Sequence, residues 1–393
     1  MSTPIIFSCQ FSTAYGGVMH TLMDIVTHID RKKFRPIVLC APDGELTALL
    51  AKENIDVRTA GKGKYWEYSL KHPFGAVRDV LTVAVEIVRL AQSEKVRIVH
   101  TFDGMVFTAA CLAKLYLPDL KVIWLDSGFN LYRLHFRMVM WWCFRRAARV
   151  ATLSNARLQQ LLAEGLDPSK AQVVPCGTDF HFRNQYLPFS QQQTNGTIQV
   201  GIVGRIVPIK NFEMFLHAAR IVADAHPNVR FMIVGSQGLF EDEIDYYHRV
   251  LRLTESLKLN DRVTFQSPVA DLAQLMKSFD MLVCSSHMET FGRTLVEAMS
   301  LSKPVVATAV GALPEVIPDG EVGFLVPDGD ATALAEGISR LVADANLRKT
   351  MGQNAHQRVL DRYDIRVVVK QWESLYNELL VDQLDESGEP ARQ

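Results

Sequence analysis

Short β-branched runs alternate with segments of helical periodicity along the whole chain, and this alternation begins twice. Parallel strands buried on both faces read as continuous apolar runs, whereas an amphipathic helix repeats its apolar residues every three or four positions. Val18, Leu22, Ile25 and Ile29 follow a Gly-Gly pair at such helical spacing. In the first half of the chain we predict strands at 4–11, 35–41, 96–100, 121–127, 149–154 and 171–177.

The polar segment 190–197, SQQQTNGT, separates this series from a second one and predicts a linker. After it, the strand candidates are TIQVGIVGR, VRFMIVG, DRVTFQS, DMLVCSS, PVVAT and VGFLV. Two such series predict an α/β protein with two doubly wound Rossmann-like domains facing each other across a cleft. We expect an N-terminal domain over 1–189, a C-terminal domain over 198–364, and an amphipathic helix over about 365–382 that packs back on the first domain. The tail DESGEPARQ, residues 385–393, is expected to be frayed.

Net charge, cysteine spacing and the lengths of apolar runs argue against several classes of protein. The 393 residues carry a formal net charge of -1, which argues against a general nucleic-acid binder. The six cysteines form no CxxC pair, as expected for reduced thiols in a cytoplasmic protein rather than a disulfide frame or a zinc site. The N-terminus resembles no signal peptide, and no segment reaches the ~18 apolar residues of a membrane span. We therefore expect a cytoplasmic protein that is soluble or lies on the inner face of the membrane.

Two glutamates, Glu289 and Glu297, bracket a Phe-Gly turn in SSHMETFGRTLVEAM. The preceding run DMLVCSS predicts a strand, and a helix is expected from about Arg293 to Leu301. The first backbone N–H groups of that helix, at Arg293 and Thr294, suit an anion such as a phosphate. Carboxylates accept hydrogen bonds from sugar hydroxyls, so the order hydroxyl–phosphate–hydroxyl suggests a nucleoside-diphosphate sugar. The alternative is structural: Glu289 caps the helix and Glu297 is solvated.

A second loop supplies cations. VGIVGRIVPIKN places Gly201, Gly204, Arg205 and Lys210 at the exit of the first strand of the second domain. Glycines let the backbone approach a ligand, and two cations in one loop can neutralise a diphosphate leaving group. The loop is neither the dinucleotide GxGxxG motif nor a GxxxxGK[ST] P-loop. Taken alone, the two cations would be ordinary surface charges beside a turn.

GRIVPIKN together with ETFGRTLVEAMSLSKPVVATAVGALPEVIPDGEVGFLVPDGD resembles retaining glycosyltransferase family 4, whose members are nucleotide-sugar-dependent and have the two-domain GT-B fold. The resemblance covers nearly the whole chain. It is specific in the second domain and looser in the first, where Gly16-Gly17 opens a helix, ATLSNA follows a strand and VVPCGTDFHF precedes the linker.

The resemblance implies a role for each motif. The first domain would bind the acceptor and the second domain the donor. Arg205 and Lys210 would hold the donor diphosphate, Glu297 the ribose, and Glu289 the donor sugar together with the backbone of Phe291 and Gly292. The remaining donor contacts would come from the backbone of Val269 to the base and from Gly16 and Gly17 to the diphosphate.

The chain departs from the family at one position. The family usually has a histidine after a first-domain strand, near the transferred sugar, where this chain has Asp126. An aspartate there could accept a sugar hydroxyl or the proton of the acceptor, so Asp126 is a catalytic candidate beside Glu289, Arg205 and Lys210. His100, one strand earlier, is expected to be a packing residue.

The resulting hypothesis is transfer of a hexosyl group from a UDP- or GDP-linked sugar to an acceptor hydroxyl of a glycan, glycolipid or small molecule, with retention at the anomeric carbon. The proposed setting is synthesis of a cell-surface polysaccharide or glycolipid. No DxD-type pair stands at a strand end, so we expect metal-independent catalysis with no cofactor, and no nucleic-acid partner.

Other functions fit the sequence less well. A glycosidase would use two carboxylates but would have no use for the cation loop. A nicotinamide-dependent oxidoreductase lacks its glycine fingerprint. A sugar-nucleotide epimerase or phosphorylase of the same fold remains an alternative, as does a non-catalytic scaffold that retains the donor pocket.

Two stretches, 61–75 and 131–150, combine basic and aromatic residues. Arg137, Trp141, Arg145 and Arg146 in the second stretch are candidates for contact with the acceptor or with an anionic membrane surface. The alternative is an amphipathic helix whose aromatic residues pack in the core and whose arginines are solvated.

Overall fold

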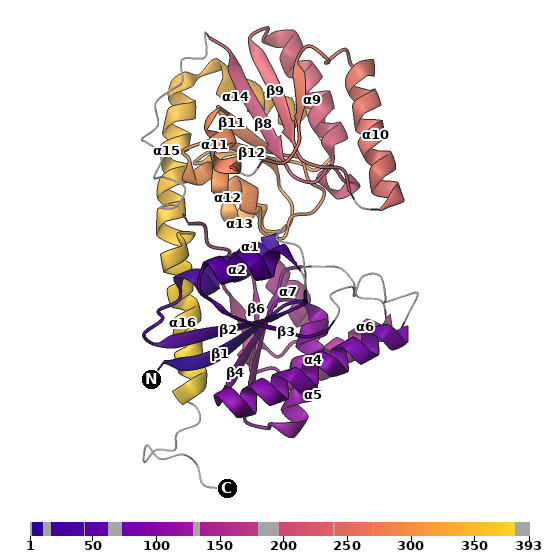
Figure 1. The fold of residues 1–393 in the computed structure, drawn as a ribbon. Coiled ribbons are helices and arrows are strands. Elements are labelled where there is room, and N and C mark those ends of the chain that lie inside the picture. The colour runs from indigo at the N-terminus through magenta and orange to yellow at the C-terminus, as the bar shows by residue number, and fades with distance from the viewer. Residues whose placement is uncertain are drawn as a thin grey trace. The chain divides into compact units, whose positions relative to one another are not determined.

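The computed structural model describes residues 2–10, 17–42, 44–61, 73–128, 134–179, 196–238, 240–269 and 271–381. The chain divides into two compact units, one of residues 1–177 with 365–393 and one of residues 178–364. Each unit is a parallel sheet with helices between successive strands, so the predicted α/β class with two Rossmann-like domains is confirmed (Figure 1). Six of the eight residues of the predicted linker, 190–195, lie outside the described residues, as do the predicted frayed residues 385–393.

The first unit has a seven-stranded sheet of order β3-β2-β1-β4-β5-β6-β7 with parallel pairing throughout. Its strands are β1 (Thr3–Ser8), β2 (Phe34–Cys40), β3 (Asp56–Thr59), β4 (Ile98–Thr101), β5 (Lys121–Asp126), β6 (Arg149–Thr152) and β7 (Ala171–Val173). Its helices are α1 (Gly17–His28), α2 (Glu45–Lys52), α4 (Pro73–Glu94), α5 (Gly104–Tyr116), α6 (Leu134–Arg146), α7 (Asn155–Ala163), the 3-10 turn η1 (Pro168–Lys170) and α16 (Ile365–Val381).

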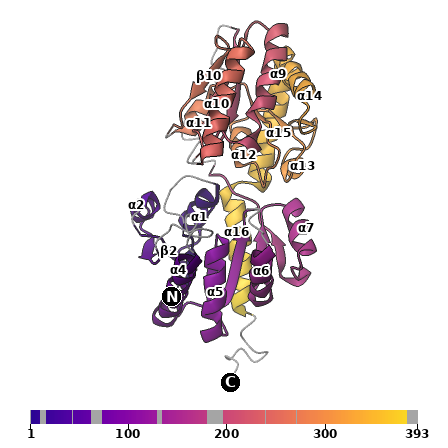
Figure 2. The same cartoon turned by 90° about the vertical axis from the view of Figure 1, so that its right-hand side faces the viewer.

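The two faces of this sheet are covered by different helices. α4, α5 and α6 lie side by side over one face, where α5 packs against both neighbours (Figure 2). α16 packs against α1 and belongs to this unit. Tyr376 on α16 is hydrogen-bonded through its hydroxyl to His100 Nδ1 at 2.8 Å, and the ring of Trp372 lies 4.4 Å from the His100 ring. His100 is therefore a buried packing residue, as expected from the sequence.

The second unit has a six-stranded parallel sheet of order β10-β9-β8-β11-β12-β13. Its strands are β8 (Ile198–Val203), β9 (Val229–Val234), β10 (Val263–Gln266), β11 (Met281–Cys284), β12 (Val305–Thr308) and β13 (Gly323–Val326). Its helices are η2 (Pro208–Lys210), α9 (Phe212–Ala225), α10 (Glu241–Ser256), α11 (Leu272–Lys277), α12 (Arg293–Ser300), α13 (Leu313–Val316), α14 (Ala331–Ala343) and α15 (Ala345–Arg362).

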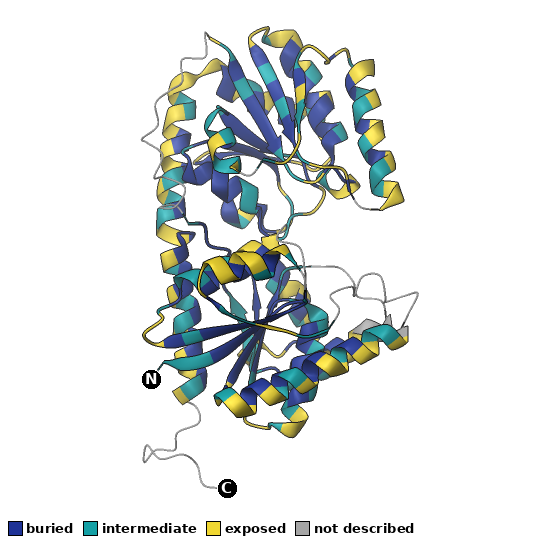
Figure 3. Cartoon of the chain, in the orientation of Figure 1, coloured by how far each residue is buried: buried dark blue, intermediate teal, exposed yellow. Residues whose placement is uncertain are grey.

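The predicted strands match the observed ones except at their ends and at one edge. Central strands such as β1, β8 and β12 are buried along most of their length, which explains their continuous apolar runs (Figure 3). The sequence prediction missed β3 (DVRT), which has a single apolar residue and is half-exposed to exposed because this strand lies at the edge of the sheet. The strand predicted over 171–177 ends at Val173, and Gly177 lies against Ile365.

Candidate functional site

The candidate residues of the second unit gather at the carboxyl ends of β8 and β11, which are neighbouring strands. In open α/β sheets, ligands bind beyond this edge. β8 ends at Val203 and leads through Gly204 and the exposed Arg205 to Lys210, the last residue of η2. β11 ends at Cys284 and leads through Ser285 and Ser286 to Glu289.

Hydrogen bonds hold these two loops together. The Ser285 hydroxyl donates to the carbonyl oxygens of Lys210 at 3.1 Å and Asn211 at 2.9 Å. The His287 N–H donates to the carbonyl of Ile209 at 2.9 Å. Asn211 itself adopts the left-handed conformation (φ 48°) and caps α9 through its side chain. The cation loop is thus fixed both to the carboxylate loop and to the start of the next helix.

Lys210 and Glu289 form an ion pair in which Nζ donates to Oε2 at 2.5 Å. Both side chains keep part of their surface in solvent, 30% for Lys210 and 15% for Glu289. Burial is the largest single influence and lowers the pKa of Lys210, but the charge and hydrogen bond of Glu289 and the charge of Cys284 together outweigh it, so the net pKa is raised. The lysine is therefore a stable cation at neutral pH, available to an anionic ligand.

Helix α12 begins directly after this loop. Its N-cap Gly292 has φ 86°, and an added Cβ would lie 2.6 Å from Leu313 Cδ2, so the entry to the helix requires glycine. Arg293 and Thr294 occupy the first turn, where backbone N–H groups have no partner within the helix. The predicted limits of this helix are therefore confirmed to within one residue, and anion binding at its start stays a prediction.

Glu297 lies one turn into α12 and is largely buried. Its Oε1 accepts from Arg293 Nε at 3.1 Å, and its backbone carbonyl accepts from the Ser300 hydroxyl at 2.6 Å. This carboxylate is not simply solvated, as the structural alternative supposed. It is held in place, partly desolvated and paired with the arginine that begins the helix.

Gly311 packs closely against the backbone of the Glu289 loop. Gly311, after β12, has φ 53°, and a Cβ there would lie 2.0 Å from the Glu289 carbonyl oxygen. The next residue, Ala312, donates its N–H to that same oxygen at 3.0 Å. A side chain at position 311 would therefore displace Glu289.

Other predicted donor residues of this unit have mixed environments. The Phe291 side chain is buried and packs edge-on against Tyr363 at 5.5 Å, which leaves only its backbone for a ligand. Val269 is half-buried in the loop after β10. Gly201, predicted to admit a ligand, lies in mid-strand, where an added Cβ would be 2.4 Å from the Phe279 ring. That expectation was wrong, because the glycine makes room for a core side chain.

The sequence analysis missed Cys284 and Ser286. Both line one pocket with Lys210, Glu289 and Thr294. Ser286 Oγ lies 3.5 Å from Glu289 Oε2, and burial raises the pKa of the Cys284 thiol. Their position directly after the apolar run of a predicted strand was the signal that could have identified them.

In the first unit, Asp126 ends β5 and is buried. Its Oδ2 accepts from Arg157 Nε at 2.6 Å, and its Oδ1 accepts from the Gly128 N–H at 3.0 Å. Arg157 is also buried. Burial raises the pKa of Asp126, although the Arg157 charge acts in the opposite direction. Within this unit the carboxylate has a structural partner, and its catalytic role stays a prediction.

The two first-unit glycines give little information. Gly17 is the first residue of α1 and is exposed, and nothing lies within 4 Å of the Cβ that another residue would add. Packing therefore does not require glycine at that position. Gly16 lies outside the described residues.

The basic and aromatic stretch at 131–150 contains α6. Arg137, Trp141 and Arg145 are exposed, Arg146 is half-buried, and the guanidinium of Arg145 lies 4.8 Å from the Trp141 ring centre. Phe144 packs in the core, as the structural alternative expects, while Trp141 does not. Contact of this stretch with an acceptor or a membrane stays a prediction. Most of the stretch 61–75 lies outside the described residues.

The acidic run at residues 241–243 lies at the start of a helix. Glu241, Asp242 and Glu243 form the first turn of α10, where acidic side chains stabilise the positive end of the helix dipole. Among the described residues, no three His, Cys, Asp or Glu side chains are grouped so as to hold a metal ion. Within the same ranges, no helix has the length and apolar character of a membrane span.

Comparison with protein families gives one match for each half of the chain. The family described as Glycosyltransferase Family 4 matches residues 15–182, and that described as Glycosyl transferases group 1 matches residues 186–358. The boundary between the two matches falls close to that between the two structural units.

Two curated relatives illustrate the range of similarity. The capsular polysaccharide biosynthesis glycosyltransferase CapM of Staphylococcus aureus is 26% identical over 84% of this chain and 92% of that protein. The N-acetyl-alpha-D-glucosaminyl L-malate synthase of Bacillus anthracis is 34% identical, but the match covers only 35% of this chain and 36% of that enzyme.

Among solved structures, HepE of Anabaena in complex with UDP and glucose superposes with a TM-score of 0.79 at 23% identity, covering 96% of this chain and 100% of that one. A glycosyltransferase from Rickettsia africae gives a TM-score of 0.81 at 20% identity over 96% and 99% of the two chains. At such low identity these superpositions show the fold alone. Together with the two family matches, they place this chain in glycosyltransferase family 4, as a glycosyltransferase with the GT-B fold.

Proposed function

We propose that the chain transfers a hexosyl group from a nucleoside-diphosphate sugar to an acceptor hydroxyl, with retention at the anomeric carbon. The observation that carries this proposal is the Lys210–Glu289 pair beside the first turn of α12. It combines a cation, a carboxylate and the positive end of a helix dipole at one strand edge, which matches the chemistry of a sugar diphosphate.

Different residues bind different parts of the donor in this proposal. Lys210 and Arg205 hold the diphosphate and, with the N–H groups of Arg293 and Thr294, stabilise the charge that develops as it leaves. Glu297 accepts the ribose hydroxyls, and Glu289 with the backbone of Phe291 and Gly292 positions the transferred sugar. Val269 meets the base through its backbone. Because two cations and a helix terminus already face the leaving group, we propose catalysis without a metal ion or cofactor.

The donor base and the acceptor are part of the same proposal. The complex of HepE with UDP and glucose supports a UDP-linked sugar over a GDP-linked one. The name of CapM supports a cell-surface polysaccharide or glycolipid as the product. We propose that the enzyme works in the cytoplasm at the inner face of the membrane, in keeping with its free cysteines and with the exposed arginines and tryptophan of α6.

The first experiment is calorimetric titration of the protein with UDP, GDP, ADP and dTDP, with and without a chelator. We expect one diphosphate to bind, unaffected by chelator, and to lose binding in Glu297→Ala and Arg205→Ala. Lys349→Ala, on the exposed surface of α15, is the matched control. Wild-type affinity in both site variants would contradict the proposal.

Turnover assays separate the alternatives that share this fold. A transferase consumes the donor only when an acceptor is present. An epimerase would convert the donor alone, and a scaffold would bind the diphosphate without consuming any donor.

A further inference from the structure

Helix α4 carries a row of apolar side chains on its solvent-facing side. Phe74, Val77, Leu81 and Val85 are between 51% and 90% exposed. At 100° per residue these four positions fall within roughly 80° of one another, and the row is about 16 Å long. An exposed row of this kind is unusual, because large apolar side chains in contact with water cost free energy.

The opposite side of the same helix is apolar as well. Val83, Ile87 and Leu90 are buried in the core of the first unit. A surface helix normally has one apolar stripe toward the core and polar residues outside. A helix that is apolar on two opposite sides can bury both of them. In α4 the core of the first unit covers one side, and the other side is left in solvent.

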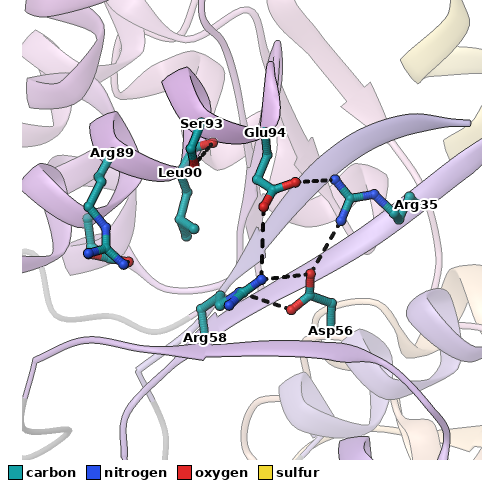
Figure 4. A network of polar contacts seen from close by, with 8 residues as sticks. Arg35, Asp56, Arg58, Arg89, Leu90, Ser93 and Glu94 are labelled. Atoms are coloured by element: carbon teal, nitrogen blue, oxygen red, sulfur yellow. Dashed lines mark hydrogen bonds and ion pairs between the residues drawn. The ribbon is translucent and has the colours of Figure 1, made fainter.

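The end of α4 is held in place by a polar network (Figure 4). Glu94 accepts from Arg35 on β2 at 2.7 Å and lies 3.9 Å from Arg58 on β3. Asp56 pairs with both arginines, at 3.3 Å and 3.0 Å. Such partly exposed pairs contribute little stability individually, but a closed network fixes geometry. The apolar row is therefore presented by a helix tied to the sheet at its C-terminal end.

Helix α6 extends the same surface. It lies in the same layer as α4, on the other side of α5 (Figure 2). Its Met138, Val139 and Trp141 are exposed, and Arg137 and Arg145 stand beside them. A tryptophan next to arginines is typical of the interface between hydrocarbon and lipid headgroups.

The exposed charges around the α4 row are mainly positive. Arg78 and Arg89 flank it on one side, and both are well exposed. The acidic neighbours are Glu86, paired with Arg89 at 3.3 Å, and the buried Asp79, whose Oδ1 lies 3.8 Å from Arg78 Nε. Apolar side chains with a basic border are complementary to an anionic lipid surface, where each nearby Lys or Arg adds about 1 kcal/mol of attraction.

We propose that the outward sides of α4 and α6 form one surface, the α4–α6 face, that lies on an anionic lipid membrane. The α4–α6 face consists of Phe74, Val77, Leu81 and Val85 with Met138, Val139 and Trp141, bordered by Arg78, Arg89, Arg137 and Arg145. The inference rests on the membrane location in the proposed function and assigns it to a specific surface. It makes the first unit the membrane-bound one, where a lipid-linked acceptor would be presented.

Vesicle binding of the full chain tests the proposal. We expect the protein to sediment with mixed phosphatidylcholine–phosphatidylglycerol vesicles and much less with phosphatidylcholine alone. The double variant Leu81→Ser with Val85→Ser should partition about tenfold or more weakly, because it removes two of the inserting side chains. Arg78→Gln with Arg89→Gln should weaken binding to the anionic vesicles only. Ile221→Ser, an exposed apolar residue of α9 in the second unit, is the matched control and should bind as wild type does.

Each other outcome would contradict the assignment. Wild-type partitioning of the Leu81/Val85 variant would exclude the α4 row, and no vesicle binding of wild type would exclude the membrane. A wild-type dimer that the same variant dissociates, without vesicle binding, would identify the face as a contact between two copies of the chain. Binding of UDP is measured in parallel. Leu81 and Val85 lie in the first unit and the proposed donor site lies in the second, so the double variant should bind UDP as wild type does, and a failure of the donor site can be told apart from a failure of the membrane proposal.

Discussion

The strand ends of the two units carry titratable side chains in contrasting environments. In the first unit, Asp126 is 3% exposed and its partner Arg157 is buried with it. In the second unit, Glu289 and Lys210 form a pair of similar length that stays partly in solvent. Both pairs consist of one carboxylate and one cation after parallel strands, so composition alone does not distinguish them.

The difference in burial separates structural from ligand-binding pairs. Two charges that are buried together stabilise each other. If one of them bound a ligand instead, the other would remain as an unpaired buried charge at a high cost in free energy. A pair at the solvent edge can exchange its partner for a phosphate or a sugar hydroxyl at small cost, because water screens both states. On this basis we expect Asp126 to maintain the fold of its unit, and Lys210 and Glu289 to act on the substrate.

The largest effect is expected at the buried pair. Asp126→Ala should lower the free energy of unfolding by about 3–5 kcal/mol, because Arg157 would keep a buried charge without its carboxylate. Urea denaturation measures this change. The double variant Asp126→Leu with Arg157→Met should recover most of the loss, since it removes both charges together.

Transfer activity provides the opposing outcome for Asp126. A variant Asp126→Ala with wild-type urea stability and no transfer would assign the carboxylate to catalysis, as predicted from its position in the family. The comparison between the two units would then be wrong for this residue.

At the exposed pair the expected effect is on rate rather than on stability. Lys210→Ala should lower the transfer rate about 10²–10³-fold, the usual consequence of losing one charge that stabilises a leaving group. Its free energy of unfolding should change by less than about 1 kcal/mol, because the pair is partly solvated. Initial rates of donor consumption, measured beside urea denaturation, check both parts.

The raised pKa of Lys210 adds a pH test to the same variant. Because the charge and hydrogen bond of Glu289, with the charge of Cys284, raise this pKa above its ordinary value despite burial, the lysine stays protonated at neutral pH. No loss of wild-type rate near neutral pH should therefore come from Lys210. An alkaline fall in rate near neutrality that disappears in Lys210→Arg would contradict this.

These contrasts also show how far the sequence could predict the structure. The strands with continuous apolar runs and the cation and glutamate loops were predictable, because burial on both faces and strand-end position leave local patterns. The edge strand β3 was not, since its residues alternate without a strong apolar run. The role of Gly201 depends on the ring of Phe279, 78 positions later in the chain, and no local pattern records such a contact.

The pairing of Asp126 and the face of α4 escaped prediction for the same reason. Asp126 meets Arg157 31 positions later, and only the fold brings the two together. In α4, apolar residues on both sides of the helix predict a fully buried helix, whereas the tertiary structure leaves one of those sides in solvent. Residue type and spacing identify candidates, and burial decides between them.

The smallest of these effects on stability should come from His100, another titratable group near a first-unit strand end. Complete burial lowers its pKa to about 3, against 6.5 when exposed. Because the unfolded chain binds the proton more readily, stability from this group is complete above pH 6.5 and is lost as the pH falls toward 3. Between pH 7 and pH 5 the wild type should lose about 2 kcal/mol from His100 alone.

His100→Gln tests this assignment because glutamine can retain a hydrogen bond to the Tyr376 hydroxyl but does not titrate in this range. The variant should be less stable than wild type at pH 7, where the packing against Trp372 is disturbed. Its stability should then change less than that of wild type between pH 7 and pH 5. Urea denaturation at both pH values measures the two slopes. Equal slopes would mean that the pKa of His100 is the same in the folded and the unfolded chain, which would contradict its complete burial.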